Sequence, residues 1–400
     1  MSADILDFAD PAFLDDPYPA FARQREAAPF AWHEGLQAFV ATSHQHVSAV
    51  LRDRRLGRIF RPREPEGEWE TFNWLHADSI LDSEPPKHTR LRRLVAGAFG
   101  RGHVQRLAPR VEELATQLLD AATDGTAPFD VIESYAEPLP VLVIAELLGF
   151  PDIDRHLLRP WSQAIVKMYE VDRTPLQENQ AREACRDFAA YVSDLAAHRI
   201  DHPGKDLLTD LVQIRDGSDK LSERELIATA VLLLNAGHEA SVNGMGNGLH
   251  SWLAAGKPGP LDPDRPAAVE ALVEEFLRHD SPLQLFERTA TDDLEIAGVP
   301  IAKGHKAIAL LGAANRDPEV FTDPDTFAPA RTPNNHLAFG LGIHFCIGAP
   351  LARLELHIST RLLLTRYPEL ALVDAVRRPT FVLRGFESLI VAPGPTGSGG

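Results

Sequence analysis

Cysteine is scarce in this chain: its 400 residues include two, Cys185 and Cys346, which lie far apart in the sequence. Two distant cysteines cannot form the disulfide framework of a small secreted scaffold. Long apolar runs are missing too, since none approaches the roughly 20 residues that span a bilayer, and the acidic N-terminus lacks the apolar core of a signal peptide. We therefore expect a cytoplasmic protein without a membrane partner, in which Cys185 is structural.

Basic residues are in deficit, because 40 lysines and arginines face 57 aspartates and glutamates, which gives a net charge of −17. Such an acidic chain is a poor candidate for binding nucleic acid. One local exception is a group of arginines, which we interpret either as a solvated helix face or as a docking surface for an acidic partner protein: Arg90, Arg92, Arg93, Arg101 and Arg106.

Linkers, internal repeats and low-complexity segments are absent before the glycine-rich C-terminus. At roughly 150 residues per domain, the length alone would suggest two or three domains. Because no linker supports that division, we expect a single domain over residues 1–392 and a disordered tail over residues 393–400.

What the sequence does contain is a glycine-rich stretch around the second cysteine, Phe339-Gly340-Leu341-Gly342-Ile343-His344-Phe345-Cys346-Ile347-Gly348, followed by Ala349-Pro350. Glycine adopts left-handed backbone angles without steric cost, so the stretch predicts a tightly folded loop. Pro350 suits the first turn of a helix. The Cys346 sulfur would then lie at the N–H end of that helix, which favours the thiolate over the thiol. The stretch therefore predicts a preorganised anionic sulfur ligand.

Other interpretations of Cys346 are weaker. Most free cysteines are small buried hydrophobes, but the glycines, His344 and the following helix argue against that here. A structural zinc site needs a ligand spacing that His344 and Cys346 do not provide. A lone thiolate suits a metal that brings its own equatorial ligands, and haem iron is the obvious one.

The stretch closely resembles the haem-binding loop of the cytochromes P450, the haem-thiolate monooxygenases. The matching pattern is an aromatic residue, Gly, one residue, Gly, one residue, a basic residue, one residue, Cys, one residue and Gly. The resemblance implies haem b (iron protoporphyrin IX) as the cofactor, with Cys346 as the axial iron ligand, Phe339 beside the sulfur and His344 at a haem propionate. Gly340 and Gly348 complete the loop. It also implies a mainly α fold with small β-sheets, in which the haem lies between a long central helix and the helix after the cysteine.

Other segments extend the resemblance from about residue 10 to residue 392. His88 and Arg92 are four residues apart and share a helix face, which would be solvent-exposed by default. In the family, a His and an Arg at these places hold a haem propionate, and a guanidinium can grip a carboxylate with two hydrogen bonds. Arg288 matches another propionate-binding arginine of the family.

A long central helix is predicted after Ser222-Glu223-Arg224-Glu225, which has the form of a capping box. The helix runs from about Glu223 to Ala254, roughly 48 Å at 1.5 Å per residue. Ala236 and Gly237, near its middle, are small enough for a flat cofactor to approach the backbone, although tight helix packing would also use small residues.

Glu239 interrupts the apolar pattern of this helix, and an acid in such a place needs a partner or a purpose. The segment resembles the family's oxygen-activation motif, in which an acid relays protons and the following Thr steadies dioxygen. Here Ala240 stands in the place of Thr, and Ser241 lies about 100° further round the helix. Ser241 could substitute through a local distortion, water and a substrate hydroxyl could complete the relay, or the enzyme does not perform ordinary hydroxylation.

Glu275 and Arg278 are three residues apart on a helix opened by Pro266, so they can pair on one face. Their place about 70 residues before the cysteine resembles the family's Glu-x-x-Arg core, and Arg331 matches its third member. We interpret these three residues as structural.

Pro62, Pro65 and Gly67 break regular structure in residues 60–80, so we expect a loop there, whose aromatic residues either pin it to the core or line a pocket. By resemblance to the family, this region covers the substrate. By resemblance, the candidate pocket residues are Trp74, Phe72, Met168, Leu233, Leu283, Leu285, Phe286 and Phe386. They are aromatic and aliphatic, which favours a small apolar substrate such as a terpenoid, a steroid, a polyketide or an aromatic compound.

The resemblance implies a monooxygenase that puts one oxygen atom of dioxygen into a C–H bond and releases the other as water. Because the chain has no flavin or iron–sulfur signature, its electrons would come from a ferredoxin and a ferredoxin reductase. One alternative is a peroxygenase that uses hydrogen peroxide, with room for the peroxide at Ala240 and Glu239 as its acid–base group. Another is a haem protein for sensing or electron transfer that is not an enzyme.

Overall fold

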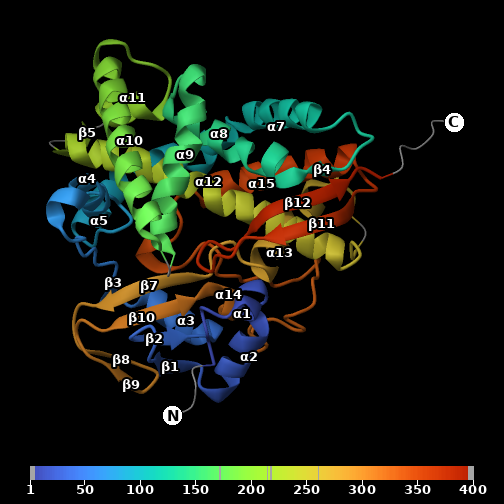
Figure 1. Cartoon of the computed structure of the whole chain (residues 1–400), viewed down its shortest axis with the longest axis horizontal. Coiled ribbons are helices and arrows are strands. Elements are labelled where there is room, and N and C mark those ends of the chain that lie inside the picture. Colours follow the sequence, from blue (N-terminus) through green and yellow to red (C-terminus); the bar gives the residue numbers. More distant parts are fainter. Residues whose placement is uncertain (1–4, 171–172, 214, 217–218, 260, 395–400) are drawn as a thin grey trace. The chain divides into compact units, whose positions relative to one another are not determined.

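The computed structural model describes residues 5–170, 173–213, 215–216, 219–259 and 261–394, and it is mainly helical with small β-sheets (Figure 1). This confirms the predicted fold class. The chain divides into two compact units, the first with residues 1–57, 108–138 and 240–400 and the second with residues 58–107 and 139–239. The single domain over residues 1–392 stays a prediction, and residues 395–400 of the predicted tail lie outside the described residues.

The first unit contains a five-stranded sheet that takes its strands from both ends of the chain. Their order is β1 (Phe30–His33), β2 (Ala38–Ala41), β10 (Lys306–Leu310), β7 (Leu285–Ala290) and β3 (Leu56–Gly57), and all neighbours are antiparallel except β2 and β10. Small helices accompany the sheet: α1 (Pro11–Asp15), α2 (Tyr18–Ala27), α3 (His44–Arg52) and α14 (Leu311–Ala314). The apolar face of α3 is buried at Val47, Val50 and Leu51 in the core beside this sheet.

The remaining elements of the first unit include η5 and α15, which flank the cysteine loop. They are the helices α7 (Ala108–Ala122), η2 (Ile132–Ala136), α13 (Pro266–His279), η5 (Gly342–His344) and α15 (Ala349–Arg366), the sheet β11 (Ala371–Arg377), β12 (Phe386–Ala392) and β4 (Phe129–Asp130), and the hairpin β8 (Leu294–Ile296) and β9 (Val299–Ile301). Helix α15 packs against both α7 and α13. Gly298 lies in the turn between the two hairpin strands and has a φ of 85°.

The second unit is helical apart from one short hairpin, β5 (Arg215–Asp216) and β6 (Asp219–Lys220). Its helices are α4 (Glu66–Ala77), α5 (Lys87–Ala96), η1 (Gly97–Phe99), α6 (Arg101–Gln105), α8 (Pro138–Leu148), η3 (Asp152–Asp154), α9 (Arg155–Val166), η4 (Lys167–Tyr169), α10 (Pro175–Asp201) and α11 (Leu207–Gln213). Helix α10 packs on both α4 and α9. Cys185 is buried in α10, and burial raises the pKa of its thiol to about 12, as suits a structural cysteine.

Residues 66–77 form helix α4, so the prediction of a loop across residues 60–80 is wrong. The prolines precede the helix instead of interrupting it, since Pro65 occupies the N-cap position with extended backbone angles. Gly67 falls in the first turn, where a helix tolerates glycine. The aromatic residues therefore lie on one helix, where Trp69 and Phe72 are buried.

The central helix α12 (Glu223–Ala254) has the predicted bounds, and its residues up to Glu239 belong to the second unit while the rest belong to the first. The predicted capping box is present. The Ser222 N–H donates to Glu225 Oε2 at 2.9 Å, and the Glu225 N–H donates to Ser222 Oγ at 3.2 Å.

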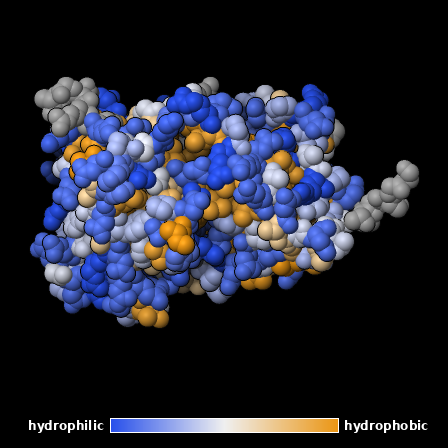
Figure 2. All heavy atoms as spheres, turned by 90° about the horizontal axis from the view of Figure 1, so that it is seen from above, coloured by the Kyte–Doolittle hydropathy of each residue, from blue (hydrophilic) through white to orange (hydrophobic). Residues whose placement is uncertain are grey.

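Hydrophilic residues cover most of the face seen in Figure 2, where hydrophobic residues show as several separate areas. Within the described residues, no helix is long and apolar enough to cross a membrane.

Candidate functional site

Cys346 lies in the loop between η5 and α15, and its side chain is exposed. Gly340 and Gly342 have φ values of 69° and 74°, in the left-handed region that favours glycine. A Cβ at Gly342 would lie 2.4 Å from the Leu51 carbonyl oxygen, so a larger residue cannot fit without moving backbone. Gly348 differs, because its φ is −83° and a Cβ there would lie 3.9 Å from the Cys346 Sγ. Two of the three glycines thus fix the predicted tight loop by their backbone angles.

The loop is fastened on both sides of the sulfur. The Cys346 N–H donates to the Phe339 carbonyl at 3.0 Å, and the Ala349 N–H at the start of α15 donates to the Cys346 carbonyl at 3.4 Å. Pro350 lies in the first turn of α15, as predicted. Cys346 therefore sits at the N-terminal end of an 18-residue helix, whose dipole stabilises a thiolate.

Phe339 is held by a charged pair that the sequence did not reveal. The Arg353 guanidinium lies 4.4 Å from the centre of the Phe339 ring and binds Glu274 through Nε at 2.7 Å. Burial alone would raise the pKa of Glu274, but hydrogen bonds from Arg353 and His336 outweigh it and lower the pKa to about 2. Glu274 is thus a stable anion that fixes Arg353 over the ring.

Glu275, Arg278 and Arg331 form one buried cluster in the first unit. Arg278 Nη2 lies 2.7 Å from Glu275 Oε1, and Arg331 Nε lies 3.4 Å from Glu275 Oε2. Neither Glu275 nor Arg278 is exposed at all, so this is a paired and hydrogen-bonded buried ion pair. The pairing that the three-residue spacing predicted is present.

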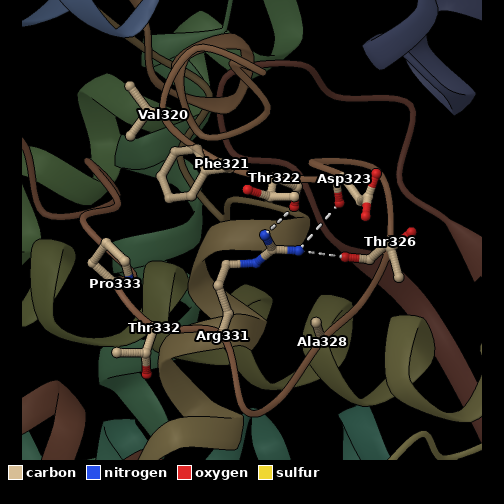
Figure 3. Close-up of a pocket in the computed structure, with 9 residues that line it drawn as sticks. All are labelled: Val320, Phe321, Thr322, Asp323, Thr326, Ala328, Arg331, Thr332 and Pro333. Carbon is tan, nitrogen blue, oxygen red and sulfur yellow. Dashed lines mark hydrogen bonds between the residues drawn. The ribbon is translucent and has the colours of Figure 1, made fainter.

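Arg331 also holds the loop that surrounds it. Figure 3 shows its guanidinium among the carbonyl groups of Thr322, Asp323 and Thr326, and it donates to the last of these at 2.9 Å. The same residues line a cavity of about 260 Å³. Arg331 thus joins the Glu275 carboxylate to three backbone carbonyl groups of the loop, which fits the predicted structural role.

One face of α12 is left open in the middle of a buried helix. Ala236 is exposed, and Leu232 and Ala240, one turn away on either side, are half-buried. Residues at this four-residue spacing share a face. Gly237 points elsewhere, because a Cβ there would lie 3.2 Å from the Ile144 side chain of α8. Each of the two interpretations of Ala236 and Gly237 therefore applies to one residue. Ala236 lies on the open face that a flat cofactor could approach, and Gly237 allows close helix packing.

The catalytic candidates on α12 have partners that sequence reasoning missed. Ser241 is hydrogen-bonded to the carboxyl of Glu355 on α15, and both side chains are buried. Glu239 is 5% exposed, and its Oε1 lies 3.4 Å from Nε2 of His238, which is not exposed at all. His238 Nδ1 in turn lies 3.2 Å from the Ser162 hydroxyl of α9. Glu355 was findable by the argument that singled out Glu239, because it too is an acid in an apolar part of a helix.

The propionate candidates come from both units. In the first, Arg288 is buried on β7 and His344 is half-buried in η5. The Arg288 Nη1 donates to the Glu287 carbonyl at 2.9 Å. In the second, His88 is buried and Arg92 half-buried on α5, on the shared face that their spacing predicted. Each candidate is thus placed on a regular element of its own unit, and their common ligand stays a prediction.

Arg90 does not belong to a free docking surface. Its guanidinium forms an ion pair with Glu225 of the α12 capping box and donates to the Lys220 carbonyl. Arg106 contacts His103 and the Gly102 carbonyl. Arg93 is exposed, and the Arg101 side chain lies outside the described residues. Arg90 is therefore engaged in contacts within the protein and does not support the interpretation of the arginines as a docking surface.

The pocket candidates of the second unit are mostly enclosed. Phe72 is 3% exposed and stacks on His76 at 4.0 Å between ring centres, while Met168 and Leu233 are also buried. Trp74 is half-buried and lies against the Arg224 guanidinium, 5.4 Å from its ring centre. Phe72 thus contributes to helix packing, and Trp74 keeps a partly open ring.

The pocket candidates of the first unit differ among themselves. Leu283, Leu285 and Phe286 are half-buried on or beside β7. Phe386 is 2% exposed, with the Arg377 guanidinium 4.2 Å and the His250 ring 4.6 Å from its centre. This enclosure gives Phe386 a packing role. Leu383, three residues earlier, is half-buried and forms an isolated β-bridge with Leu283. It is therefore a better candidate than Phe386 for the wall of the substrate pocket.

The donor set at Cys346 fits a metal that brings its own ligands. Within the part of the chain that the structure describes, no group of three His, Cys, Asp or Glu side chains is arranged to hold a metal ion. Cys346 is a single exposed sulfur at a helix N-terminus. These features fit haem with a thiolate ligand.

Known proteins agree with this chemistry. The sequence model of the family described as Cytochrome P450 matches residues 267–386. The chain is 39% identical over 398 residues to the cytochrome P450 monooxygenase PikC of Streptomyces venezuelae, a match that covers 94% of this chain and 91% of the relative.

Solved structures share the fold. The structure of P450BioI in complex with an acyl carrier protein ligated to hexadec-9Z-enoic acid superposes with a TM-score of 0.91 at 34% identity, over 96% of this chain and 100% of that one. The bacillaene polyketide synthase cytochrome P450 PksS of Bacillus subtilis 168 gives a TM-score of 0.87 at 34% identity, over 98% and 99% of the two chains.

Proposed function

This chain belongs to the cytochrome P450 family, and from that premise we propose that it is a haem-thiolate monooxygenase acting on a small apolar molecule. The observation that carries the proposal is the exposed Cys346 in a loop shaped by Gly340 and Gly342 at the start of α15. The alternative of a haem protein without catalysis is disfavoured, because PikC is named a monooxygenase.

The residues that would hold haem b are Cys346 at the iron, His88, Arg92, Arg288 and His344 at the propionates, and Ala236 beside the plane of the ring. When bound, the haem supplies the activation of dioxygen, and electron donation by the thiolate favours cleavage of the O–O bond. The protein contributes the thiolate, the orientation of the substrate and the delivery of protons. The hydrogen bond from the Cys346 N–H to the Phe339 carbonyl fixes the backbone of the loop, and the α15 dipole favours the thiolate.

Protons would be handled by two buried carboxyl groups. Glu239 is the acid on α12 that matches the family motif. Glu355 keeps its proton more readily, because burial raises its pKa well above 4.5, and a hydrogen bond from Ser241 offsets this in part. Since Ser241 is bonded to Glu355 and α12 is a regular helix throughout, we favour the interpretation in which water and a substrate hydroxyl act in place of the missing Thr.

For the substrate, we propose a polyketide-derived compound. The pocket candidates Trp74, Leu283, Leu285 and Phe286 are apolar and partly open, and the PksS structure belongs to a polyketide synthase system. Ferredoxin and ferredoxin reductase are the proposed electron donors. Because P450BioI was solved with an acylated carrier protein, a carrier-bound substrate is the second candidate. The cytoplasmic location stays a prediction.

The test uses the two cysteines as a matched pair. The reduced protein treated with carbon monoxide is expected to show the red-shifted Soret band of a thiolate ligand. Cys346→Ala should abolish that band, while Cys185→Ala in α10 should keep it. A Cys346→Ala protein that retained the band would show that Cys346 is not the thiolate ligand.

A second measurement addresses the peroxygenase alternative, which Ala240 motivates. Product formation with a ferredoxin and its reductase is compared with product formation from hydrogen peroxide alone. We expect the ferredoxin system to support faster turnover. Faster turnover with peroxide would instead favour the peroxygenase.

A further inference from the structure

Three buried polar side chains form a line in the second unit that ends at Glu239. The Ser162 hydroxyl of α9 lies 3.2 Å from His238 Nδ1, and His238 Nε2 lies 3.4 Å from Glu239 Oε1. Ser162 and His238 are fully buried and Glu239 is 5% exposed. The line therefore connects two helices out of contact with bulk water.

Glu239 is the residue that lies next to the second ring nitrogen of His238, Nε2. Nδ1 contacts the Ser162 hydroxyl, whereas Nε2 makes no hydrogen bond in the described residues and lies 3.4 Å from Glu239 Oε1. A buried N–H without an acceptor is costly, so Nε2 is served best by a Glu239 oxygen. We assign the tautomer with the proton on Nε2, in which the Ser162 hydroxyl donates to Nδ1 and the Nε2–H faces the Glu239 carboxyl group.

Packing around the imidazole restricts its movement. The preceding residue, Gly237, packs closely on α8, since a Cβ added there would lie 3.2 Å from the Ile144 side chain. Ser162 holds the ring from α9. An imidazole fixed from two sides can hold an adjacent carboxylate in one rotamer, which is how supporting residues orient catalytic groups.

We propose that His238 and Ser162 are positioning residues that hold the Glu239 carboxylate for proton delivery. The inference rests on the proposed function, in which Glu239 is the acid that handles protons. His238 keeps Oε1 in place, and Ser162 fixes the ring that does so.

The same line connects the acid to a part of the protein that the substrate is expected to touch. Helix α9 leads directly into η4, which carries the pocket candidate Met168 and Tyr169, and the Tyr169 hydroxyl lies 3.3 Å from His76 Nε2 on α4. A substrate that changed the position of α9 would thereby change the hold on Glu239.

Two substitutions of His238 separate its contact with Ser162 from its contact with Glu239. In His238→Asn the amide falls near the place of Nδ1, so it can meet Ser162 but cannot reach Glu239. In His238→Gln the amide falls near the place of Nε2 and can still donate to Glu239. We expect His238→Asn to lower the product formed per NADPH by about tenfold, against about a hundredfold for Glu239→Gln, while His238→Gln restores most of it.

Readouts other than turnover guard against a merely structural effect. The substrate dissociation constant, from the ligand-induced shift of the Soret band, should stay within about twofold of the parent in every variant. In thermal unfolding of the holoprotein, His238→Asn and Glu239→Gln should be non-additive, as expected for groups in contact. Ser162→Ala is the smallest change in the line and should lower the product yield in the same direction as His238→Asn.

The outcomes distinguish this inference from the function it rests on. If the parent protein lacks the thiolate band or turnover, the proposed function fails. If the parent works and Glu239→Gln is impaired, but His238→Asn and Ser162→Ala give the parent yield and additive stability, only the positioning role is overturned. An equal loss in His238→Asn and His238→Gln would also overturn it, because the bond to Glu239 would then be irrelevant.

Discussion

The Ser241 hydroxyl on α12 is hydrogen-bonded to the Glu355 carboxyl on α15, and both groups are buried. Burial raises the pKa of Glu355 well above its usual 4.5, because an ionised carboxylate is poorly solvated there. The Ser241 hydroxyl favours the ionised form and opposes this shift in part. Glu355 therefore keeps its proton more readily than an exposed glutamate does, and it is joined to the hydroxyl of the residue that follows Ala240.

The raised pKa of Glu355 makes stability depend on pH. A carboxyl whose pKa is higher in the folded state than in the unfolded state binds more protons when folded. Its contribution to stability is fully present below about pH 4.5 and is lost as the pH rises from there toward the folded pKa. Each tenfold difference in proton affinity between the two states corresponds to about 1.4 kcal/mol. We expect Glu355→Gln, which is neutral at every pH, to flatten this part of the curve.

Urea unfolding of the parent and of Glu355→Gln at intervals between pH 5 and pH 8 checks this expectation. The stability of the variant relative to the parent should increase with pH. Glu113→Gln, at an exposed position on α7, serves as the control and should follow the parent. A relative stability of Glu355→Gln that stayed constant over the whole range would contradict a raised pKa.

Breaking the buried pair of Glu275 and Arg278 should be far more damaging than breaking an exposed pair of the same spacing. Glu275→Gln leaves the Arg278 charge buried without its counterion, at a cost of about 3–5 kcal/mol. Arg110 and Glu113 provide the comparison, since they also pair three residues apart but on an exposed face. Glu113→Gln should change little, because exposed ion pairs contribute little.

Chemical unfolding of the two variants, together with their haem content after purification, tests the contrast. Glu275→Gln should unfold at lower denaturant concentration and retain less haem. Equal midpoints for Glu275→Gln and Glu113→Gln would show that the buried cluster has no special structural weight.

Gly342 should tolerate no side chain. A Cβ there would meet the Leu51 carbonyl at 2.4 Å in a backbone conformation with φ of 74°, so Gly342→Ala should cost about 1–3 kcal/mol and displace the cysteine loop. Gly67 in the first turn of α4 has open space where its Cβ would lie. Gly67→Ala should therefore be neutral or stabilise by up to about 1 kcal/mol.

The share of protein that gives the thiolate carbon monoxide band measures the state of the loop, and thermal unfolding measures stability. We expect a smaller share for Gly342→Ala and an unchanged one for Gly67→Ala. The prediction is wrong if both variants match the parent in band and in melting temperature.

What the sequence could predict was set by short-range chemistry. The capping box of Ser222 and Glu225, the pairing of Glu275 with Arg278, and the tight turns at Gly340 and Gly342 all depend on residues a few positions apart. Local spacing fixes such features before any tertiary contact forms.

What the sequence could not reveal depends on contacts between distant segments. Ser241 and Glu355 are far apart in the chain, as are Ser162 and His238, and no periodicity links them. The helix α4 was missed for another reason. Pro65 was interpreted as a breaker, although at the N-cap position a proline precedes a helix without opposing it.

The open position at Ala240 leads to the last prediction, which tests how the missing hydroxyl is replaced. Ala240 is half-buried on the open face of α12, next to Ala236 one turn away. If water and a substrate hydroxyl complete the proton path, Ala240→Thr should lower turnover of substrates that carry a hydroxyl and raise it for apolar substrates that lack one. Ala240→Val has the same shape as Thr without its hydroxyl, so it separates volume from hydrogen bonding. Product per NADPH with both substrate classes is the measurement, and an identical response of the Thr and Val variants would show that volume alone decides, against a hydroxyl-dependent path.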